Sequence, residues 1–356
     1  MDMIQIDGSY LEGGGQIVRT ALALSVLTGK PFEVEGIRKG RKNSGLKNQH
    51  LYCIRSLQKL SRSEAEGAEL GSERLRFSPG KFRASNIDID IETAGSITLL
   101  LQSLLIPCML GDKPIKLTIQ GGTDTKWSMP ADYFREILIP QLRRYADIKF
   151  SIKRRGYYPK GGGIVDIRIS PRFSFSQLKD APRIELTEQG NLMQIKGVSH
   201  CSMSLENARV ADRQAESAKS ALKDFECPVD IRNEYSESLS DGSGIVLWAI
   251  FSEHDDDIDD KNPIRIGSDS LGERGKRAEI VGKEAAERLK KQMSSNVPVD
   301  EYLADNLIPL LGLFGGSIRV AKISKHTLTN IYVVEKFLDV KFDVDEEKKL
   351  ISVDNK

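Results

Sequence analysis

Apolar and polar positions follow the same order in two segments of the chain, residues 14–37 and 94–120. Each segment starts with small residues, continues with an apolar helix pattern over 17–24 or 97–105, turns at a glycine and a proline, and enters a β-rich run. The segments begin about 80 residues apart, and self-similarity at a fixed offset is typical of duplicated units. The pattern therefore predicts a repeated helix–turn–strand unit.

A third copy of this pattern lies late in the chain. It predicts a helix over Leu303–Leu313, a turn at Gly315-Gly316 and a strand over Ser317–Ile323. The pair Ile308-Pro309 also matches Ile106-Pro107 of the second copy. The chain thus contains three related units.

Each copy continues with a polar loop and a second helix, and the second copy adds a hairpin pattern in which Ile148–Ile152 is followed by Gly163–Ile169. The repeated unit is therefore predicted to be two helices on a small sheet. If the units form a pseudo-threefold array, we expect their polar loops to converge on one site. These loops carry Arg38, Lys39, Arg41 and Lys42 in the first copy, Asp124 and Lys126 in the second, and His326 in the third.

The repeat is interrupted between Pro182 and Val297, which indicates an inserted second domain. An acidic run at 253–260 within it lacks the spacing of a calcium loop, which favours a solvated loop over a metal site. The predicted elements of the insertion are strands over Leu192–Val198, Val229–Ile231 and Gly244–Phe251 and helices over Ala208–Lys223 and Ala278–Met293.

The predicted fold class is α/β (α+β): a large domain of three repeated two-helix/β-sheet units in a pseudo-threefold arrangement, with a smaller inserted α/β domain. Repeats one and two of the large domain are assigned to residues 1–182, the inserted small domain to 183–296, and repeat three to 297–356.

Composition narrows the class of protein. The chain has 356 residues, 39% of them hydrophobic, which suits a folded protein with two cores. Its 52 basic and 51 acidic residues give a net charge of +1, so any contact with a polyanion must be local. The cysteines at 53, 108, 201 and 227 are too widely spaced for a zinc site or a disulfide framework. No signal peptide opens the chain and no apolar run approaches the roughly 20 residues of a membrane span, so we expect a cytoplasmic protein without membrane contact.

Three glycines at 13–15 precede the first helix pattern. Such a run lets backbone N–H groups approach phosphate oxygens closely. It is not a P-loop, because no Gly-Lys-Ser/Thr follows, and it lacks the context of the dinucleotide fingerprint. Glu12 would repel a phosphate there unless a divalent cation lay between them, which favours Mg²⁺ or Mn²⁺. A plain strand-to-helix turn with an exposed acid is the alternative.

His326 stands between a strand pattern and a helix pattern. A helix entrance offers unpaired backbone N–H groups that favour anions, so an imidazole there can meet a phosphate as a nucleophile or as a neutral polariser. The alternative is a capping or core histidine. Tyr302 and Asp305, at another predicted helix start, have the chemistry to stack on a base and bind a ribose. By spacing alone, a core tyrosine and a solvated acid are the simpler interpretation.

Taken together, the motifs resemble the RNA 3′-terminal phosphate cyclase family. The resemblance runs nearly the whole chain and rests on separated matches that occur in order. The matches are Asp7-Gly8, Glu12 to Ile17 and Arg19; Gly40-Arg41, Gly45-Leu46, Gln49-His50-Leu51 and Gly67 to Ser72; Gly121 to Asp124, Tyr158-Pro159 and Gly161 to Gly163; and Glu301 to Asp305, His326 and Leu328 to Ile331.

The resemblance implies a large domain of three α/β repeats with a smaller inserted domain, and an enzyme that uses ATP and Mg²⁺ or Mn²⁺ to convert an RNA 3′-terminal phosphate into a 2′,3′-cyclic phosphate. The histidine matching His326 would attack the ATP α-phosphorus to form a histidine-AMP adduct. AMP would then pass to the RNA phosphate, and the ribose 2′-hydroxyl would expel it. Glu12 would contact the metal, and Arg38 and Arg41 the RNA phosphate. The nucleotide would be held by Gln16, Arg19, Gln102, Pro130, Tyr302, Asp305 and Asn306.

Two other classes of function stay open at this point. A catalytically silent relative that binds ribosomal RNA or assembly proteins would use the same scaffold, but such relatives lack the nucleophilic histidine, and this chain has His326. An enolpyruvyl-type transferase also uses such repeats around a phosphate-binding cleft, but its sixfold repetition would need a longer chain. A homodimer is possible through an edge strand of the inserted domain, although no sequence feature forces one.

Overall fold

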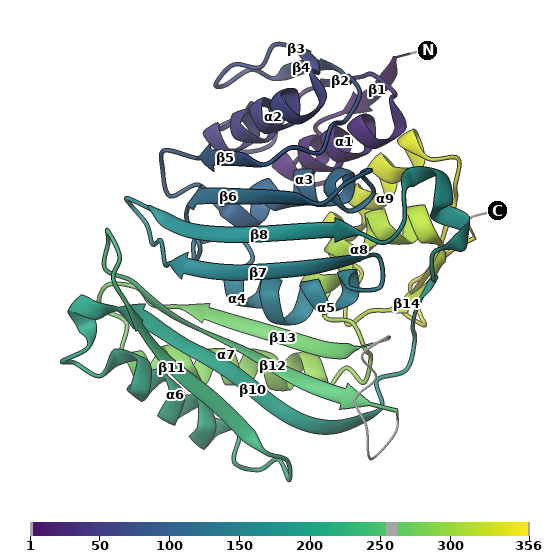
Figure 1. The fold of residues 1–356 in the computed structure, drawn as a ribbon. Coiled ribbons are helices and arrows are strands. Elements are labelled where there is room, and N and C mark those ends of the chain that lie inside the picture. Colours follow the sequence, from purple (N-terminus) through teal and green to yellow (C-terminus); the bar gives the residue numbers. More distant parts are fainter. Residues whose placement is uncertain (1–2, 254–262, 355–356) are drawn as a thin grey trace.

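The computed structural model describes residues 3–253 and 263–354. These residues form four four-stranded sheets with helices packed against them (Figure 1). Three of the sheets share one pattern, in which the first strand pairs in parallel with the second and the fourth lies antiparallel between the second and the third. The predicted α/β class is therefore confirmed, and three units share one topology.

The bounds of the three units follow chain order. The first unit contains β1 (Ile4–Asp7), α1 (Gly15–Thr28), β2 (Phe32–Glu35), α2 (Asn48–Ser61), β3 (Glu64–Glu66) and β4 (Arg74–Ser78). The second contains β5 (Ile87–Asp90), α3 (Ile97–Met109), β6 (Ile115–Gly121), α4 (Ala131–Tyr133), the π-helical η1 (Phe134–Leu138), α5 (Ile139–Leu142), β7 (Ala146–Arg154) and β8 (Gly163–Pro171), and is followed by the short 3₁₀ helix η2 (Phe175–Asp180). The third contains β9 (Ile184–Leu186), α8 (Glu301–Phe314), β14 (Gly316–Arg319), α9 (Lys325–Phe337), β15 (Phe342–Asp345) and β16 (Leu350–Val353).

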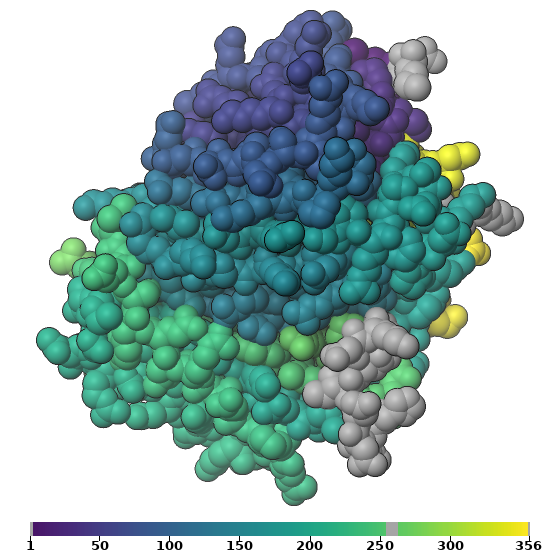
Figure 2. Space-filling model, in the orientation of Figure 1, coloured from purple at the N-terminus to yellow at the C-terminus, as the bar shows by residue number. Residues whose placement is uncertain are grey.

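The inserted domain differs in strand order. Its sheet runs β11-β10-β12-β13, and α6 and α7 pack against each other beside it. In Figure 2 this part, in green, forms the side of the molecule opposite the purple first unit. Its elements are β10 (Asn191–Ser202), η3 (Met203–Leu205), α6 (Val210–Ala221), β11 (Val229–Ser236), β12 (Ser243–Ser252), β13 (Ile264–Leu271) and α7 (Ala278–Met293).

Two details differ from the sequence predictions. Residues 184–186, assigned to the inserted domain, form β9 and pair with β14 in the third sheet. The strand predicted to reach Ile323 ends at Arg319, which pairs with Leu350 at the start of β16, and the Val320 N–H still bonds to the Lys349 carbonyl oxygen at 2.9 Å. Most of the acidic run at 253–260 lies outside the described residues. The domain boundaries themselves stay a prediction.

Local sequence signals account for the helix ends and for the matched helices of the repeats. Gly29 adopts a left-handed conformation (φ 71°) and donates its N–H to the Ser25 carbonyl at 2.9 Å, which ends α1. Asp300 caps α8 by accepting hydrogen bonds from the next turn. Pro107 in α3 and Pro309 in α8 both lie inside their helices, at the positions matched in the sequence, and α3 continues to Met109, past the predicted end at residue 105.

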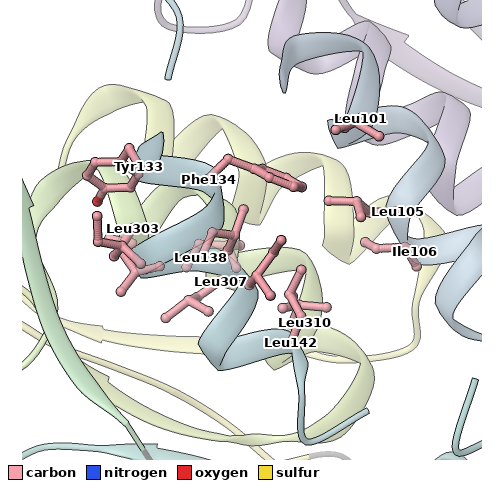
Figure 3. Packing of buried hydrophobic residues seen from close by; sticks show 14 of the residues in the cluster. Leu101, Leu105, Ile106, Tyr133, Phe134, Leu138, Leu142, Leu303, Leu307 and Leu310 are labelled. Carbon is pink, nitrogen blue, oxygen red and sulfur yellow. The ribbon is translucent and has the colours of Figure 1, made fainter. Parts of the chain in front are cut away.

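An apolar core joins the second and third units. Figure 3 shows Leu105 and Ile106 of α3 beside Leu142 of α5 and Leu310 of α8, and Leu142 and Leu310 are buried. Burial of each leucine contributes roughly 1.5–3 kcal/mol to folding. This core holds the helices that carry the candidate site residues at fixed positions relative to one another.

Candidate active site

Residues of the first and third units meet at His326. Its Nε2 lies 3.1 Å from Oε2 of Glu12, and the same oxygen accepts a hydrogen bond of 3.0 Å from Arg41. The Gln16 side chain donates to the His326 carbonyl oxygen at 3.1 Å. The polar loops of the first and third copies therefore come together, as the repeat predicted.

The first turn of α9 positions the imidazole. The Ser324 hydroxyl accepts a hydrogen bond of 3.0 Å from the Thr327 N–H and thereby caps the helix. Burial lowers the pKa of His326 below its usual 6.5, while Glu12 opposes this shift and Arg41 adds to it. The imidazole still has 42% of its side-chain surface exposed. A neutral, accessible ring is therefore favoured near neutral pH.

A chain of side-chain hydrogen bonds links three helices beside this histidine. Arg19 of α1 donates from Nε to Gln102 of α3 at 2.9 Å, and Gln102 donates to Asn306 of α8 at 2.9 Å. Asn306 in turn donates to the Tyr302 carbonyl oxygen at 2.8 Å. Arg19 is only 7% exposed, and burial lowers its pKa to about 10. This network of hydrogen bonds holds the buried, positively charged Arg19 side chain next to the site.

Asp305 is held between α8 and α9. Its Oδ1 accepts hydrogen bonds from Ser324 at 3.0 Å and from Thr327 at 2.7 Å, and Asn330 donates to its backbone carbonyl at 2.5 Å. Burial raises the pKa of Asp305 to about 7. Its carboxyl group therefore has one fixed orientation and changes charge near neutral pH.

A cavity of about 510 Å³ opens beside His326, and its size is typical of small-molecule sites. Tyr302, with a side chain that is 47% exposed, forms part of its wall, and leucines of α3, α5 and α8 form its apolar floor. All seven residues predicted to hold the nucleotide line the cavity together with His326: Gln16, Arg19, Gln102, Pro130, Tyr302, Asp305 and Asn306.

Glu12, Arg38 and Arg41 do not line this cavity. Glu12 and Arg41 lie at its His326 end through the contacts already described. Arg38 instead donates to the Asn43 carbonyl oxygen at 3.2 Å, and burial, reinforced by Arg41, lowers its pKa. The structure thus brings Glu12 and Arg41 to His326 but shows no contact between Arg38 and these three groups.

The glycine turn before α1 lies against both His326 and His50. A Cβ on Gly14 would lie 3.8 Å from Cε1 of His326, and a Cβ on Gly15 would lie 2.0 Å from Nε2 of His50, so only glycine fits at position 15. His50 Nδ1 accepts a hydrogen bond of 2.9 Å from the Lys47 N–H. Burial lowers the pKa of His50 well below 6.5. Its neutral ring therefore carries the proton on Nε2, a buried atom without a hydrogen-bond partner.

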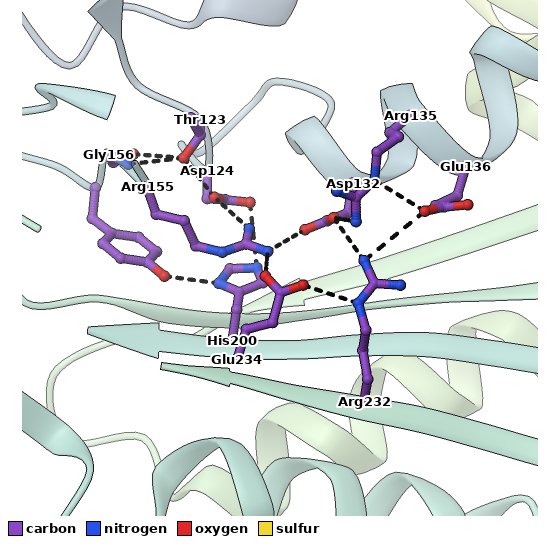
Figure 4. Close-up of polar contacts among 11 residues, drawn as sticks. Thr123, Asp124, Asp132, Arg135, Glu136, Arg155, Gly156, His200, Arg232 and Glu234 are labelled. Carbon is purple, nitrogen blue, oxygen red and sulfur yellow. Dashed lines mark hydrogen bonds and ion pairs between the residues drawn. The ribbon is translucent and has the colours of Figure 1, made fainter. Parts of the chain in front are cut away.

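The second polar loop reaches the site through Pro130, as the resemblance implied, but not through Asp124. Asp124 does not approach His326; it is buried beside Arg155 and His200, where the second unit meets the inserted domain (Figure 4). Residues 127–130 of the same loop line the cavity instead. A buried carboxylate requires a charged partner, and for Asp124 that partner is Arg155, the residue that directly follows β7.

Several residues at the site had no role in the sequence interpretation. Ser324 and Thr327 orient Asp305, and Trp127 lies at the cavity wall. A capping serine three residues before a threonine is a readable helix-start signal, but its bond to a residue on α8 depends on tertiary packing. His50 stood within a matched motif that carried no assigned role. Such contacts between distant segments leave no periodic pattern in the sequence.

The site combines the His326 imidazole, the carboxyl groups of Glu12 and Asp305, the arginines Arg19 and Arg41, and a half-exposed tyrosine. Arginine side chains and the first turn of a helix both favour anionic oxygens. The aromatic ring and the apolar floor suit a flat apolar group. The geometry therefore fits a ligand with an anionic end at His326 and Arg41 and an aromatic end at Tyr302.

Within residues 3–253 and 263–354, no helix has the length and apolar character that crossing a bilayer requires. The four cysteines are unpaired, and Cys53, Cys108 and Cys201 are buried, as their spacing predicted.

Comparison with known proteins gives one consistent result. Residues 10–344 match the family model described as RNA 3′-terminal phosphate cyclase. A protein of Thermococcus onnurineus named RNA 3′-terminal phosphate cyclase is 45% identical over 351 residues, which cover 98% of this chain and 97% of the relative. Proteins of the same name from Pyrococcus abyssi and Archaeoglobus fulgidus are 43% identical (97% and 96% covered) and 40% identical (96% and 98% covered). The resemblance seen in the sequence motifs is confirmed, and the chain belongs to the RNA 3′-terminal phosphate cyclase family.

Proposed function

We propose that this chain converts an RNA 3′-terminal phosphate into a 2′,3′-cyclic phosphate at the expense of ATP, through a covalent His326–AMP intermediate. The observation that carries the proposal is the His326 imidazole, which is half-exposed, favoured as the neutral base and 3.1 Å from Glu12 at one end of the cavity. Membership of the cyclase family supports the overall reaction. The geometry of the cavity supports the nucleotide chemistry.

The cavity residues fit an adenine nucleotide. The exposed Tyr302 ring and Pro130 offer two walls for a base, and the Asp305 carboxyl group is an acceptor for ribose hydroxyls. Arg19 supplies positive charge for the phosphates, and the unpartnered His50 Nε2–H lies at the glycine turn where an anion would be held. Without a bound anion this buried donor has no hydrogen-bond partner, which is costly.

Glu12 fits a Mg²⁺ or Mn²⁺ ion that is held mainly by the nucleotide. The only described group of three or more His, Cys, Asp or Glu side chains with ligand spacing lies elsewhere, around His200. Mg²⁺ is commonly bound by one or two carboxylates together with phosphate oxygens and water, so a single carboxylate is sufficient here. When bound, the ion would neutralise charge on the phosphates during transfer. Glu12 would then engage the ion instead of His326.

The proposed reaction proceeds in three steps. His326 forms an N–P bond to the α-phosphorus as the bond to the bridging oxygen breaks, and diphosphate leaves with the electron pair. An oxygen of the RNA phosphate, held by Arg41 and Arg38, then displaces the imidazole from the α-phosphorus. Finally the ribose 2′-hydroxyl loses its proton, attacks the 3′-phosphorus and expels AMP. A phosphate monoester has no good leaving group until AMP is attached, which is why the adduct is needed.

The test follows label from α-³²P-ATP into protein. The wild-type chain with Mg²⁺ or Mn²⁺ is expected to form an acid-labile adduct, and His326→Ala is expected to form none. Lys325→Ala is the matched control, because Lys325 is the exposed neighbour of His326 on α9. Adding RNA with a 3′-phosphate should discharge the adduct and yield a cyclic end, whereas RNA with a 3′-hydroxyl should not.

Absence of label on the wild type, or equal label on His326→Ala, would contradict the mechanism. If the adduct forms but RNA 3′-phosphate does not discharge it, the nucleotide chemistry would stand and the transfer of AMP to RNA would be wrong. The choice between Mg²⁺ and Mn²⁺, a homodimeric state and a cytoplasmic setting stay predictions.

A further inference from the structure

The loop between β6 and α4 presents the most exposed large apolar side chain among the described residues. Trp127 is 94% exposed. Tryptophan is strongly buried on average, and an exposed one beside a ligand site marks a contact surface. Trp127 also lines the cavity that contains His326. The ring therefore stands at the mouth of the candidate site.

The loop holds this ring in place. Trp127 has a φ of 61°, a left-handed conformation that a bulky residue adopts only when its surroundings impose it. The Thr125 and Ser128 hydroxyls lie 2.9 Å apart, and Ser128 donates to the Thr125 carbonyl oxygen at 2.9 Å. Lys126 forms an ion pair of 3.1 Å with Glu273. A tight, bonded turn thus presents the indole to solvent.

A second exposed aromatic residue lies on the adjoining loop. Tyr158 is 77% exposed, and its loop joins the Trp127 loop through the bridge between Asp124 and Tyr157. The backbone bond from Thr123 to Gly156 belongs to the same junction, and Figure 4 shows these two residues together. Lys126 and Lys160 are exposed neighbours of the two rings in sequence. Exposed rings with adjacent cations are the features that bind single-stranded nucleic acid.

We propose that Trp127 stacks on the base of the RNA 3′-terminal nucleotide. The identity of the ligand rests on the proposed function, in which Arg41 and His326 receive the terminal phosphate. The ATP base already has walls inside the cavity, at Tyr302 and Pro130, whereas the Trp127 ring is exposed to solvent. Because Trp127 and His326 line the same cavity, we infer that a strand with its terminal phosphate at His326 places its last base against this ring. Stacking on one aromatic side chain corresponds to roughly 5- to 150-fold in binding.

The fluorescence of the chain reports directly on this contact. The sequence contains two tryptophans, and the other, Trp248, is 2% exposed. A short single-stranded RNA with a 3′-phosphate, added without ATP, is expected to quench the emission of the wild type and of Trp248→Phe. It is expected to leave the emission of Trp127→Phe nearly unchanged. Trp127→Ala should bind the RNA roughly 5- to 150-fold more weakly by filter binding, and Trp127→Phe should fall between it and the wild type.

Nucleotide binding provides the discriminating measurement. Adduct formation from labelled ATP, without RNA, should stay close to the wild-type rate in Trp127→Ala, whereas RNA binding falls roughly 5- to 150-fold. Equal reductions would assign the ring to the nucleotide and overturn the proposal. RNA that binds the wild type without quenching Trp127 would also overturn it and would leave the ring as a protein contact. If RNA quenches Trp127 but ATP never labels His326, the adduct mechanism fails while the stacking contact stands.

Discussion

Two clusters in this molecule contain the same three kinds of side chain and differ in almost everything else. In the open cluster, His326 lies 3.1 Å from Glu12, which also binds Arg41. In the buried cluster, His200 lies 3.3 Å from Asp124, which also pairs with Arg155 at 3.3 Å. The side chains of His326 and Arg41 are 42% and 43% exposed, whereas those in the buried cluster are 0–2% exposed.

The partners of each arginine explain the difference. Arg155 is surrounded by Asp124, Asp132 and Glu234, and although burial works against its charge, Asp132 and Asp124 hold its pKa well above the usual value (Figure 4). Its bond to Glu234 on β11 ties the second unit to the inserted domain. Arg41 has one carboxylate partner and retains solvent access. A histidine, a carboxylate and an arginine thus form a structural tie when they are buried against one another, and a candidate reactive site when they stay accessible to solvent.

The largest expected effect is on stability. Arg155→Met leaves buried carboxylates without their common partner and should lower the free energy of unfolding by roughly 3–5 kcal/mol. Arg41→Met removes an exposed ion pair and should change it by less than about 1 kcal/mol. The shift of the urea unfolding midpoint at constant slope measures both.

Arg41→Met should affect activity much more than it affects stability, which is the reverse of the expectation for Arg155→Met. Arg41→Met is expected to weaken cyclisation of RNA 3′-phosphate while it keeps the wild-type unfolding midpoint. Similar midpoints for Arg155→Met and Arg41→Met would refute the division into a structural and a reactive cluster.

The carboxylates provide a second, smaller test. Glu12→Gln removes the proposed metal ligand and should slow adduct formation roughly 10²-fold, since a bound ion contributes several kcal/mol to such a transfer. Its unfolding midpoint should stay close to that of the wild type. Asp124→Asn should instead lower the free energy of unfolding by about 1–3 kcal/mol, because a buried charged bond is lost.

Metal titration distinguishes the role of Glu12 from a general loss of charge. If Glu12 binds the ion, a higher Mn²⁺ concentration should restore part of the activity of Glu12→Gln. An unchanged rate across the titration, or a Glu12→Gln variant as active as the wild type, would remove Glu12 from the metal site.

The sequence predicted the units and their shared fold, because helix and strand periodicity repeats at a steady offset. It also predicted that the loops of Arg41 and His326 meet. It placed Asp124 in the wrong cluster, since nothing in the local pattern indicates that Arg155, some 31 residues later, lies beside it. The role of Ser324 in orienting Asp305 and the unpartnered nitrogen of His50 were likewise unpredictable. These features arise from contacts between units, which local periodicity does not encode.

The smallest expected effect concerns protonation in the open cluster. Because burial lowers the pKa of His326 below 6.5, the ring should be more than half neutral at pH 6.5, and metal-free protein should show its NMR titration midpoint below that value. Adduct formation at pH 6.5 should therefore exceed half of its plateau rate and reach half of that rate only at lower pH. By linkage, stability should decrease as the pH falls from 6.5 through the folded pKa, since the unfolded chain binds the proton more readily.

Removing the charge of Glu12 should shift the pKa of His326 further, and the direction of that shift tests whether the two side chains interact electrostatically. The carboxylate raises the pKa of His326, which means that Glu12→Gln should move the midpoint of His326 still lower. His50, whose pKa burial holds well below 6.5, should show no titration in the same range in either protein and serves as the internal reference. A midpoint of His326 that rises in Glu12→Gln would mean that the carboxylate does not stabilise the charged ring. The short contact between Glu12 and His326 would then reflect packing alone.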